Sequence, residues 1–358
     1  LREREDLVCL GLQNRLANLS QATCAVEPFR VAVLGAHNPD FAVAFRAVRG
    51  AGATVAPVDP NMYSVEELMA LLAEAQVHLG VLSDQAAADA ASEALRRLGK
   101  PMAVADDLAF EGHISEPASS AGGKVKRASP SMMLFAHQES NLPRAVEVPA
   151  EAVGTRLKEA ASAWRFAEGD VVLSLGLTAT ENASVIDALE APLMAGSTVE
   201  MKPCESVWDL WSALETTMAS VVFLDSQWCW RLVQSYESLS VTVKQQAAKQ
   251  QWRSFVALAP AGTVLSEELS RRWEEIFNCS LTWHFSCAEV GSLYTVQKSE
   301  GKCASNLDWR TAPGGDLCVR GLGLFSQYHG RPRSTKEAFD EDGFFRTGHR
   351  AVNVEADT

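Results

Sequence analysis

Hydrophobic and polar residues form blocks that read as strands and helices in regular succession along the first part of the chain. Leucines at roughly helical spacing predict one amphipathic helix over residues 1–25. Apolar runs predict strands over 29–34, 54–58 and 78–82, and the segments between them have the helical period, over 41–49 and 65–74. This β-α-β-α-β order is typical of a parallel sheet with helices on its faces.

The same succession returns in the second part of the chain. Strands are predicted over 171–175, 198–201, 220–224 and 252–258, and helices over 151–164, 183–194, 207–218, 228–236 and 266–277. Between the two parts, residues 84–127 are rich in alanine and serine, with a surface helix predicted over 86–98 and a Pro/Ser/Gly/Lys connector over 115–126. We therefore expect a subdomain boundary near residue 127.

Composition narrows the class of protein. The chain has 358 residues, 47% of them hydrophobic, a formal net charge of -13 and a pI near 5.1. It can bury a sizeable core, and it carries no basic surface for nucleic acid or anionic membrane. No segment has the roughly 20 unbroken apolar residues that a membrane-spanning helix needs.

Eight cysteines are scattered without a C-x-x-C pair or a nearby histidine at metal-ligand spacing. We interpret them as buried free thiols, which indicates a reducing compartment. No initiator methionine or secretory signal opens the sequence, so any targeting peptide lies outside what it shows, and the cytosol and the interior of a mitochondrion or plastid stay open.

Residues 129–148, S-P-S-M-M-L-F-A-H-Q-E-S-N-L-P-R-A-V-E-V, predict a strand, a loop and a second strand. This loop resembles the phosphate-binding loop of the adenylate-forming acyl-CoA synthetases, T-S-G-T-T-G-x-P-K-G. The resemblance implies that His137, Ser140, Asn141 and Arg144 contact nucleotide, with Arg144 keeping the positive charge of the lysine. Gln138, Asn141 and Ala145 replace glycines, and a Glu139 carboxylate roughly 4 Å from a phosphate would cost about 4 kcal/mol. An ordinary polar hairpin is the alternative interpretation.

Two further stretches resemble the same family. Residues 30–60, with the proline after Asn38 and the turn G-A-T-V-A-P-V-D-P, are similar to its opening subdomain. Residues 281–294, L-T-W-H-F-S-C-A-E-V-G-S-L-Y, are similar to the segment around Y-G-x-T-E-x-G. There the resemblance implies that Phe285 stacks on adenine and that Glu289 binds Mg²⁺, while Ala288 replaces a threonine hydroxyl. The alternative for Glu289 is a solvated acid at a strand end.

The most specific match covers residues 314–349, from G-G-D-L-C-V-R-G to D-G-F-F-R-T-G-H, and it is similar to the malonyl-CoA and short-chain acyl-CoA synthetase branch. In the family this stretch ends in T-G-D, whose aspartate accepts hydrogen bonds from both ribose hydroxyls. His349 stands there, and a neutral imidazole offers one acceptor nitrogen. The family's aromatic or histidine-rich segment beside the acyl site is here T-A-T-E-N, residues 178–182, without a histidine.

The resemblance implies the fold and its divisions. We expect the large N-terminal domain of the acyl-CoA synthetase fold, an α/β architecture with two parallel or mixed sheets flanked by helices and a small β-rich subdomain. The expected divisions are a first α/β subdomain over 1–127, a second over 128–305 with the altered phosphate loop, and a β-rich part over 306–358. The last of these is expected to end before the hinge and the C-terminal domain of the family, and whether that domain was lost or lies outside this chain stays open.

Three functions follow from these residues. The first is an ATP-dependent acid-CoA ligase that uses Mg²⁺ and CoA, whose C-terminal domain lies outside this chain. The second, which we favour, is a catalytically impaired ligase-like protein, a pseudoenzyme that serves as a scaffold subunit with protein partners. The third is a module that binds a nucleotide or acyl group. Family residues are altered in the phosphate loop, at the acyl site and at the ribose position. Because the effects of such changes within one site combine, they favour the pseudoenzyme. Candidate interfaces are the leucine-containing helix over 1–25 and the tryptophans Trp208, Trp211, Trp228 and Trp230.

Overall fold

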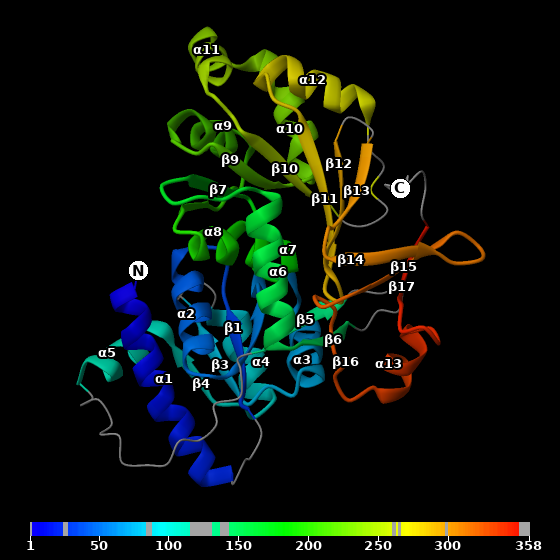
Figure 1. Cartoon of the computed structure of the whole chain (residues 1–358). Coiled ribbons are helices and arrows are strands. Elements are labelled where there is room, and N and C mark those ends of the chain that lie inside the picture. Colours follow the sequence, from blue (N-terminus) through cyan, green and yellow to red (C-terminus); the bar gives the residue numbers. More distant parts are fainter. Residues whose placement is uncertain are drawn as a thin grey trace. The chain divides into compact units, whose positions relative to one another are not determined.

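The computed structural model describes residues 2–23, 28–83, 88–114, 131–136, 143–259, 263, 266–297 and 300–350. It divides into two compact units: residues 1–153, 178–180 and 325–332 form the first, and residues 154–177, 181–324 and 333–358 form the second. Figure 1 shows the elements of both units along the chain. No helix in the described ranges combines the length and the hydrophobicity needed to cross a membrane.

The first unit is built on a seven-stranded sheet in the order β16-β6-β5-β2-β1-β3-β4. β1 pairs in parallel with β2 and β3, while β6 pairs antiparallel with β5 and β16. Its strands are β1 (Arg30–Leu34), β2 (Thr54–Val58), β3 (Leu79–Leu82), β4 (Met102–Val104), β5 (Met132–Ala136), β6 (Arg144–Val148) and β16 (Gln327–Tyr328). Its helices are α1 (Arg2–Thr23), α2 (Pro39–Gly50), η1 (Pro60–Met62), α3 (Val65–Glu74), α4 (Ala88–Arg97) and α5 (Ala105–Ile114).

The predicted βαβ pattern of this unit is confirmed. Its helices α2 and α3 have capping residues at their starts, and its strands β1 to β3 are largely buried. Asn38 accepts a hydrogen bond from the Phe41 N–H and caps α2, and Ser64 and Glu67 form a capping box on α3. All five residues of β2 are buried, as expected for a strand covered on both faces. β4 and α5 are additional elements in the segment that the sequence assigned to a surface helix and a connector. The connector itself lies outside the described residues.

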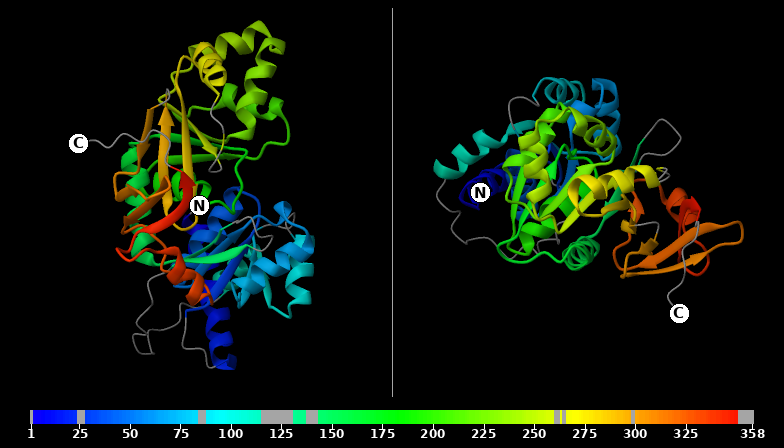
Figure 2. Two further views of the ribbon diagram at one scale, coloured as in Figure 1. Left: turned by 90° about the vertical axis from the view of Figure 1, so that its right-hand side faces the viewer. Right: turned by 90° about the horizontal axis from the view of Figure 1, so that it is seen from above.

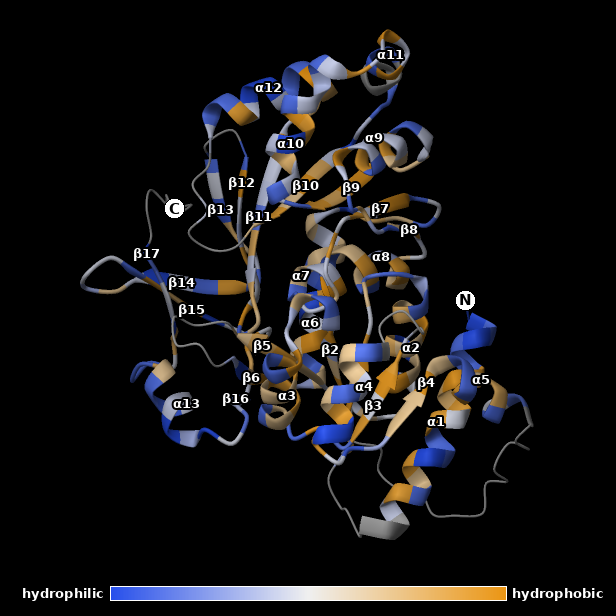
Figure 3. Cartoon of the chain, turned by 180° about the vertical axis from the view of Figure 1, so that it is seen from behind, coloured by the Kyte–Doolittle hydropathy of each residue, from blue (hydrophilic) through white to orange (hydrophobic). Residues whose placement is uncertain are grey.

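Helix α1 is only weakly amphipathic, but three of its apolar residues are buried within the first unit. Val8, Leu12 and Leu16 are buried, and α1 packs mainly on α5 and α2. The alternating apolar and polar residues of α1 are visible in Figure 3. The buried leucines are therefore part of the core of this unit.

The second unit is built on a seven-stranded sheet in the order β13-β12-β11-β10-β9-β7-β8, beside a three-stranded sheet in the order β14-β15-β17. β7 to β11 are parallel, and β12 and β13 continue the sheet antiparallel. The strands are β7 (Val171–Leu175), β8 (Thr198–Lys202), β9 (Val221–Asp225), β10 (Ser254–Ala259), β11 (Leu281–Cys287), β12 (Gly291–Gln297), β13 (Glu300–Cys303), β14 (Leu307–Thr311), β15 (Asp316–Gly321) and β17 (Phe345–Arg350).

Helices cover both faces of the larger sheet of this unit, α9 to α12 one face and α6 to α8 the other (Figures 1 and 2). α6 (Ala150–Ala163) runs from the first unit into the second. The others are α7 (Asn182–Val185), the π-helical turn η2 (Ile186–Glu190), α8 (Ala191–Met194), α9 (Val207–Thr216), α10 (Gln227–Ser235), η3 (Tyr236–Ser238), α11 (Val241–Lys249), α12 (Glu267–Phe277) and α13 (Pro332–Ala338). The helix predicted over 183–194 is thus interrupted by a π-helical turn.

The predicted α/β fold with two parallel or mixed sheets and a small β-rich part is confirmed. The second unit has an aromatic core that includes Trp211, Trp273, Phe255 and Phe277. Seven cysteines in the described ranges are free, as predicted. Only Cys229 and Cys318 are buried, however, and the other five are partly exposed: Cys9, Cys204, Cys279, Cys287 and Cys303.

Candidate functional site

The two strands predicted on either side of the phosphate loop lie in the first unit. β5 and β6 pair antiparallel with Ala136 opposite Arg144, which confirms these two strands. The Arg144 guanidinium lies 5.4 Å from the centroid of the Tyr328 ring on the neighbouring β16. Such a cation–π contact holds the arginine at the first residue of β6. The candidates His137, Ser140 and Asn141 lie outside the described residues.

The turn that carries Ala288 and Glu289 is held by a buried arginine of the second unit. Arg156 is 3% exposed, and its guanidinium donates hydrogen bonds to the carbonyl oxygens of Ala288 (3.0 Å), Glu289 (2.9 Å) and Gly323 (2.8 Å). A fourth bond reaches the Asn182 Oδ1 at 2.8 Å. Burial lowers the pKa of Arg156 to about 10, which still leaves it protonated at neutral pH.

A glycine makes room for this arginine. Gly291 follows the turn with φ of +85°, and a Cβ at this position would lie 2.8 Å from the Arg156 Cδ. Sequence reasoning missed Arg156, although a signal is present. Arg156 lies four residues after Ala152 and four before Ala160, so the three residues share one face of the helix, and both alanines are buried. A charged residue on such a face needs buried partners.

The structure brings two of the predicted site residues of the second unit together. The half-buried His349, near the end of β17, is close enough to Glu289 for the carboxylate to act on its pKa. Desolvation lowers the pKa of His349, and the Glu289 carboxylate acts in the opposite direction with a smaller effect. The imidazole is therefore neutral at pH 7, with one nitrogen as acceptor.

The Phe285 ring, predicted to stack on adenine, is stacked on Tyr294 of the adjacent strand. The ring centroids lie 4.4 Å apart, and Phe285 is 2% exposed. Phe285 belongs to the aromatic core of the second unit. One face of the ring is thus already covered by protein.

A buried polar cluster lies on the face of the sheet that α7 and η2 cover. Asp187, on η2, accepts hydrogen bonds at Oδ1 from the Trp164 Nε1 (3.0 Å) and the Ser292 Oγ (3.2 Å), and the His284 Nε2 lies 3.5 Å away. Asp187 and His284 are almost fully buried. Among the described residues, neither Asp187 Oδ2 nor His284 Nδ1 has a hydrogen-bond partner. Sequence reasoning missed this cluster, because the π-helical turn that orients Asp187 has no pattern signal.

Two carboxylates lie near each other where the sequence predicted the acyl-site segment. Burial and, to a smaller extent, the nearby Asp225 carboxylate raise the pKa of Glu181 to about 7. Burial also raises the pKa of Asp225, which ends β9. Across the ranges the structure describes, no group of three His, Cys, Asp or Glu side chains is placed to hold a metal ion.

A family model described as AMP-binding enzyme matches residues 14–329. The chain belongs to the AMP-binding enzyme family. The Arg156 cluster, the β5–β6 hairpin and Glu289 all fall within the matched residues, whereas His349 follows them.

Curated members of the AMP-binding family are distant relatives of the chain. A probable CoA ligase of Humulus lupulus is 25% identical over 252 residues, which cover 63% of this chain and 41% of that protein. The mitochondrial malonate-CoA ligase of Homo sapiens is 22% identical over 95% of this chain and 68% of that protein. The malonate-CoA ligase of Arabidopsis thaliana is 24% identical over 61% and 40%. The chain thus aligns with about two fifths to two thirds of the length of these relatives.

Solved structures of the AMP-binding family share the fold. A malonyl-CoA ligase in a ternary product complex with methylmalonyl-CoA and AMP aligns with a TM-score of 0.75 and 20% identity, over 96% of this chain and 71% of that one. The apo form of MatB from Rhodopseudomonas palustris aligns with a TM-score of 0.74 and 18% identity, over 95% and 69%.

Proposed function

We propose that this chain is a catalytically impaired acyl-CoA-ligase-like protein that serves as a structural subunit of a larger assembly. The observation that carries the proposal is the half-buried, neutral His349 beside Glu289. A nucleotide with Mg²⁺ needs acceptors for the ribose hydroxyls and anionic ligands for the metal. At this place a carboxylate is accompanied by an imidazole with a single acceptor nitrogen.

The residues in the two units fit an Mg²⁺-nucleotide poorly. In the second unit, the Phe285 ring is buried, and Tyr294 covers the face on which it stacks. In the first, Arg144 contacts Tyr328. In the phosphate loop, the Glu139 carboxylate would repel a phosphate group, and the residues that replace the family's glycines reduce the flexibility of the backbone.

The acidic pair argues against an anionic acyl substrate. Glu181 and Asp225 lie near each other, and Glu181, with a pKa of about 7, is half ionised at neutral pH. A dicarboxylate such as the malonate of the relatives would meet like charge there, and like charges disfavour binding.

Exposed apolar side chains of the second unit favour the scaffold role. Trp208 is 54% exposed, and Met194, Met218 and Val241 are also exposed. Large apolar side chains left in water are candidates for burial against a partner protein. The leucine-containing helix α1 is a weaker candidate, since Leu12 and Leu16 are already buried within the first unit.

The proposal is tested by calorimetry with Mg·ATP and with a non-hydrolysable acyl-adenylate analogue, combined with thermal shift. A ligand at about 100 times its dissociation constant would stabilise the protein by roughly 2.7 kcal/mol, which is easily seen. We expect no stabilisation at millimolar ligand. Micromolar binding that Glu289→Ala abolishes would refute the impaired-site proposal, and Glu275→Ala, at an exposed glutamate of α12, is the matched control.

A second candidate is an ATP-dependent acid-CoA ligase that uses Mg²⁺ and CoA. The observation in its favour is the buried Arg156, which fixes the Ala288–Glu289 backbone through two of its four bonds. Such rigid support is what a functional carboxylate needs. Nucleotide binding in the experiment above would make this candidate the better one, and turnover with malonate or a short-chain acid would then decide the substrate.

A further inference from the structure

A cavity of about 440 Å³ opens in the second unit between α10, α12, the end of β9 and β11. This volume lies within the range of small-molecule sites, about 300 to 1,000 Å³. Its lining is one carboxylate, two indoles, three small hydroxyl side chains, one amide and one leucine: Asp225, Trp230, Trp283, Ser226, Thr263, Ser266, Gln227 and Leu269.

The cavity lies on the opposite face of the sheet from the Asp187 cluster. Successive side chains of a strand point to opposite faces. On β11, His284 contacts Asp187, and the preceding Trp283 lines the cavity. The cavity is thus separate from the polar cluster described above.

The charge of the cavity is negative. Asp225 is the only ionisable residue among the eight that line it, and its Oδ1 accepts a hydrogen bond from the Gln227 N–H at 2.9 Å. The nearby Glu181 adds a second carboxylate to this neighbourhood. A desolvated carboxylate whose lining provides no cation gains free energy when a cationic ligand supplies one.

The indoles add a second, independent feature. Trp283 is 5% exposed, and its Nε1 has no hydrogen-bond partner among the described residues. A buried donor without an acceptor costs free energy that a ligand oxygen would recover. Trp230 is 40% exposed and offers aromatic surface, which attracts both apolar groups and organic cations.

We propose that this cavity binds a small organic amine, in its protonated form, that carries an apolar body and an oxygen acceptor. The ammonium group binds Asp225, the apolar body packs on Trp230 and Leu269, and the oxygen accepts the Trp283 Nε1–H. Carboxylate and indole together select a cation, and the volume admits one ring-sized ligand. This site shares Asp225 with the acidic pair considered under the proposed function but does not include Glu289, so Glu289→Ala is expected to leave its affinity unchanged.

Tyramine is the probe, because it carries an amine, a ring and an oxygen. Its matched controls are 4-hydroxyphenylacetate, which has a carboxylate in place of the amine, and tyrosol, which has a neutral hydroxyl. Binding is measured by calorimetry and by quenching of tryptophan fluorescence. We expect tyramine to bind at least about tenfold more tightly than tyrosol, and 4-hydroxyphenylacetate to bind most weakly.

Substitutions locate the site. Asp225→Asn keeps an oxygen for the Gln227 N–H and removes the charge, so it should abolish the preference for tyramine over tyrosol. Trp283→Phe keeps the apolar packing and removes the donor, and it should weaken tyramine several-fold. Asp308→Asn and Trp208→Phe, at exposed positions, are the controls. Circular dichroism establishes that each variant is folded.

Three outcomes would overturn the proposal. They are equal affinity for the amine and the neutral alcohol, stronger binding of the carboxylate, and no binding of any of the three at millimolar concentration. Tyramine binding that survives Asp225→Asn unchanged would also overturn it, since it would place the ligand elsewhere.

Discussion

The imidazole of His349 lies close enough to the carboxylate of Glu289 for the two to interact electrostatically within the second unit. Desolvation outweighs this attraction and lowers the pKa of His349. The pair therefore combines a carboxyl group with an imidazole ring that is neutral at pH 7. Two carboxylates at this place would instead repel each other until a cation or a hydroxyl-rich ligand bound between them.

His349→Asp should convert this place into one that responds to Mg²⁺. The variant gains a carboxylate beside Glu289, so it should be less stable than the original chain without Mg²⁺. Addition of Mg·ATP should raise its melting temperature more than that of the original chain, because two charged acceptors are then satisfied. Differential scanning fluorimetry with and without Mg·ATP measures both effects.

The control for this substitution is His113→Asp, since His113 is exposed on α5 in the first unit. It should show no change in the response to Mg·ATP. An identical response of His349→Asp and His113→Asp would mean that the pair of residues 289 and 349 has no influence on nucleotide binding.

Arg156→Met should be among the most destabilising single substitutions in the chain. The variant leaves the carbonyl oxygens of residues 288, 289 and 323 and the Asn182 Oδ1 without their donor. A buried acceptor left without its donor typically costs about 1 to 3 kcal/mol, and four acceptors are affected here. Urea unfolding at neutral pH measures the loss.

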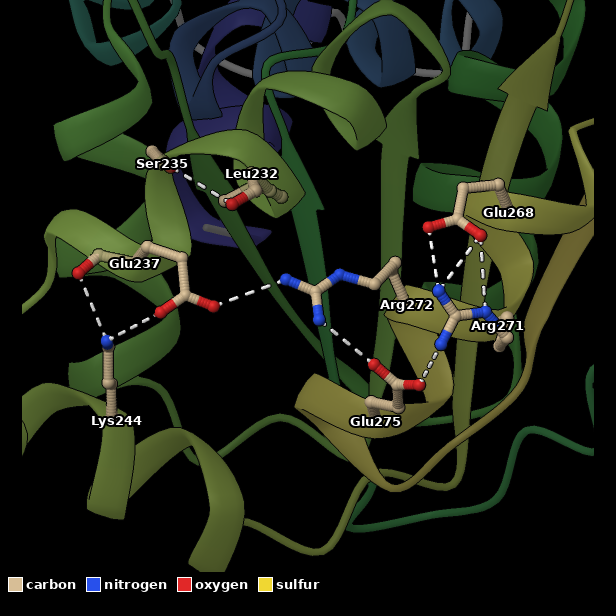
Figure 4. A network of polar contacts seen from close by, with 8 residues as sticks. All are labelled: Leu232, Ser235, Glu237, Lys244, Glu268, Arg271, Arg272 and Glu275. Atoms are coloured by element: carbon tan, nitrogen blue, oxygen red, sulfur yellow. Dashed lines mark hydrogen bonds and ion pairs between the residues drawn. The ribbon is translucent and has the colours of Figure 1, made fainter.

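Arg271→Met is the matched control for Arg156→Met. Arg271 also makes several hydrogen bonds, to Glu268 and Glu275 on α12, within the network shown in Figure 4. Because this network is exposed, water replaces the lost bonds, and the free energy of unfolding should change far less. If both variants lost the same free energy of unfolding, burial would not be the reason that the Arg156 hydrogen bonds stabilise the protein.

The sequence predicted the elements of the fold well where periodicity and caps agree. The strand over 54–58 and the helix over 65–74 occur with these bounds, because a buried apolar run and a Ser64–Glu67 capping box leave no competing structure. β4 and α5 were missed because a three-residue strand and a weakly amphipathic helix lie in an alanine-rich segment.

The candidate site could be predicted only in part. Glu289 and His349 were found through family motifs, and their proximity depends on two segments far apart in the chain. Arg156 has no motif, since its role is to satisfy carbonyl oxygens that no local pattern shows to be buried. The Asp187 cluster depends on a π-helical turn, whose extra residue per turn shifts the buried face without a sequence signal.

Gly112→Ala should destabilise the first unit, because α1 and α5 approach closely. A Cβ at Gly112 would lie far inside van der Waals contact with the Leu7 carbonyl oxygen, and one at Gly11 would meet that of Leu108. These neighbours are backbone atoms, so the helices must move apart. Overpacking of this kind costs about 1 to 3 kcal/mol.

Gly154→Ala is the control, because no atom lies within 4 Å of the added Cβ in the middle of α6. It should stabilise the protein by about 0.5 to 1 kcal/mol, since alanine loses less backbone entropy in a helix. Unfolding in urea compares the two variants. If Gly112→Ala proved as stable as Gly154→Ala, the close contact between α1 and α5 would be refuted.

His37 should make the protein sensitive to acid. It is 4% exposed in the first unit, and neither ring nitrogen has a hydrogen-bond partner among the described residues. Burial lowers the pKa of His37 to about 4, from 6.5 in the unfolded chain. Between these values the unfolded chain binds a proton that the folded protein does not, so stability falls as the pH falls. At 1.4 kcal/mol per pH unit, this group alone costs about 3 kcal/mol between pH 7 and about pH 4.

His37→Phe removes the titrating group and keeps an aromatic ring beside Phe41, whose centroid lies 6.4 Å from the imidazole. The variant should lose about 3 kcal/mol less stability than the original chain between pH 7 and about pH 4. His113→Gln, at the exposed histidine, should leave the pH profile unchanged. Because carboxylates titrate in the same range in all three proteins, the difference between their urea midpoints isolates His37. Parallel pH profiles for the original chain and His37→Phe would mean that the imidazole is protonated in the folded state and has an acceptor there.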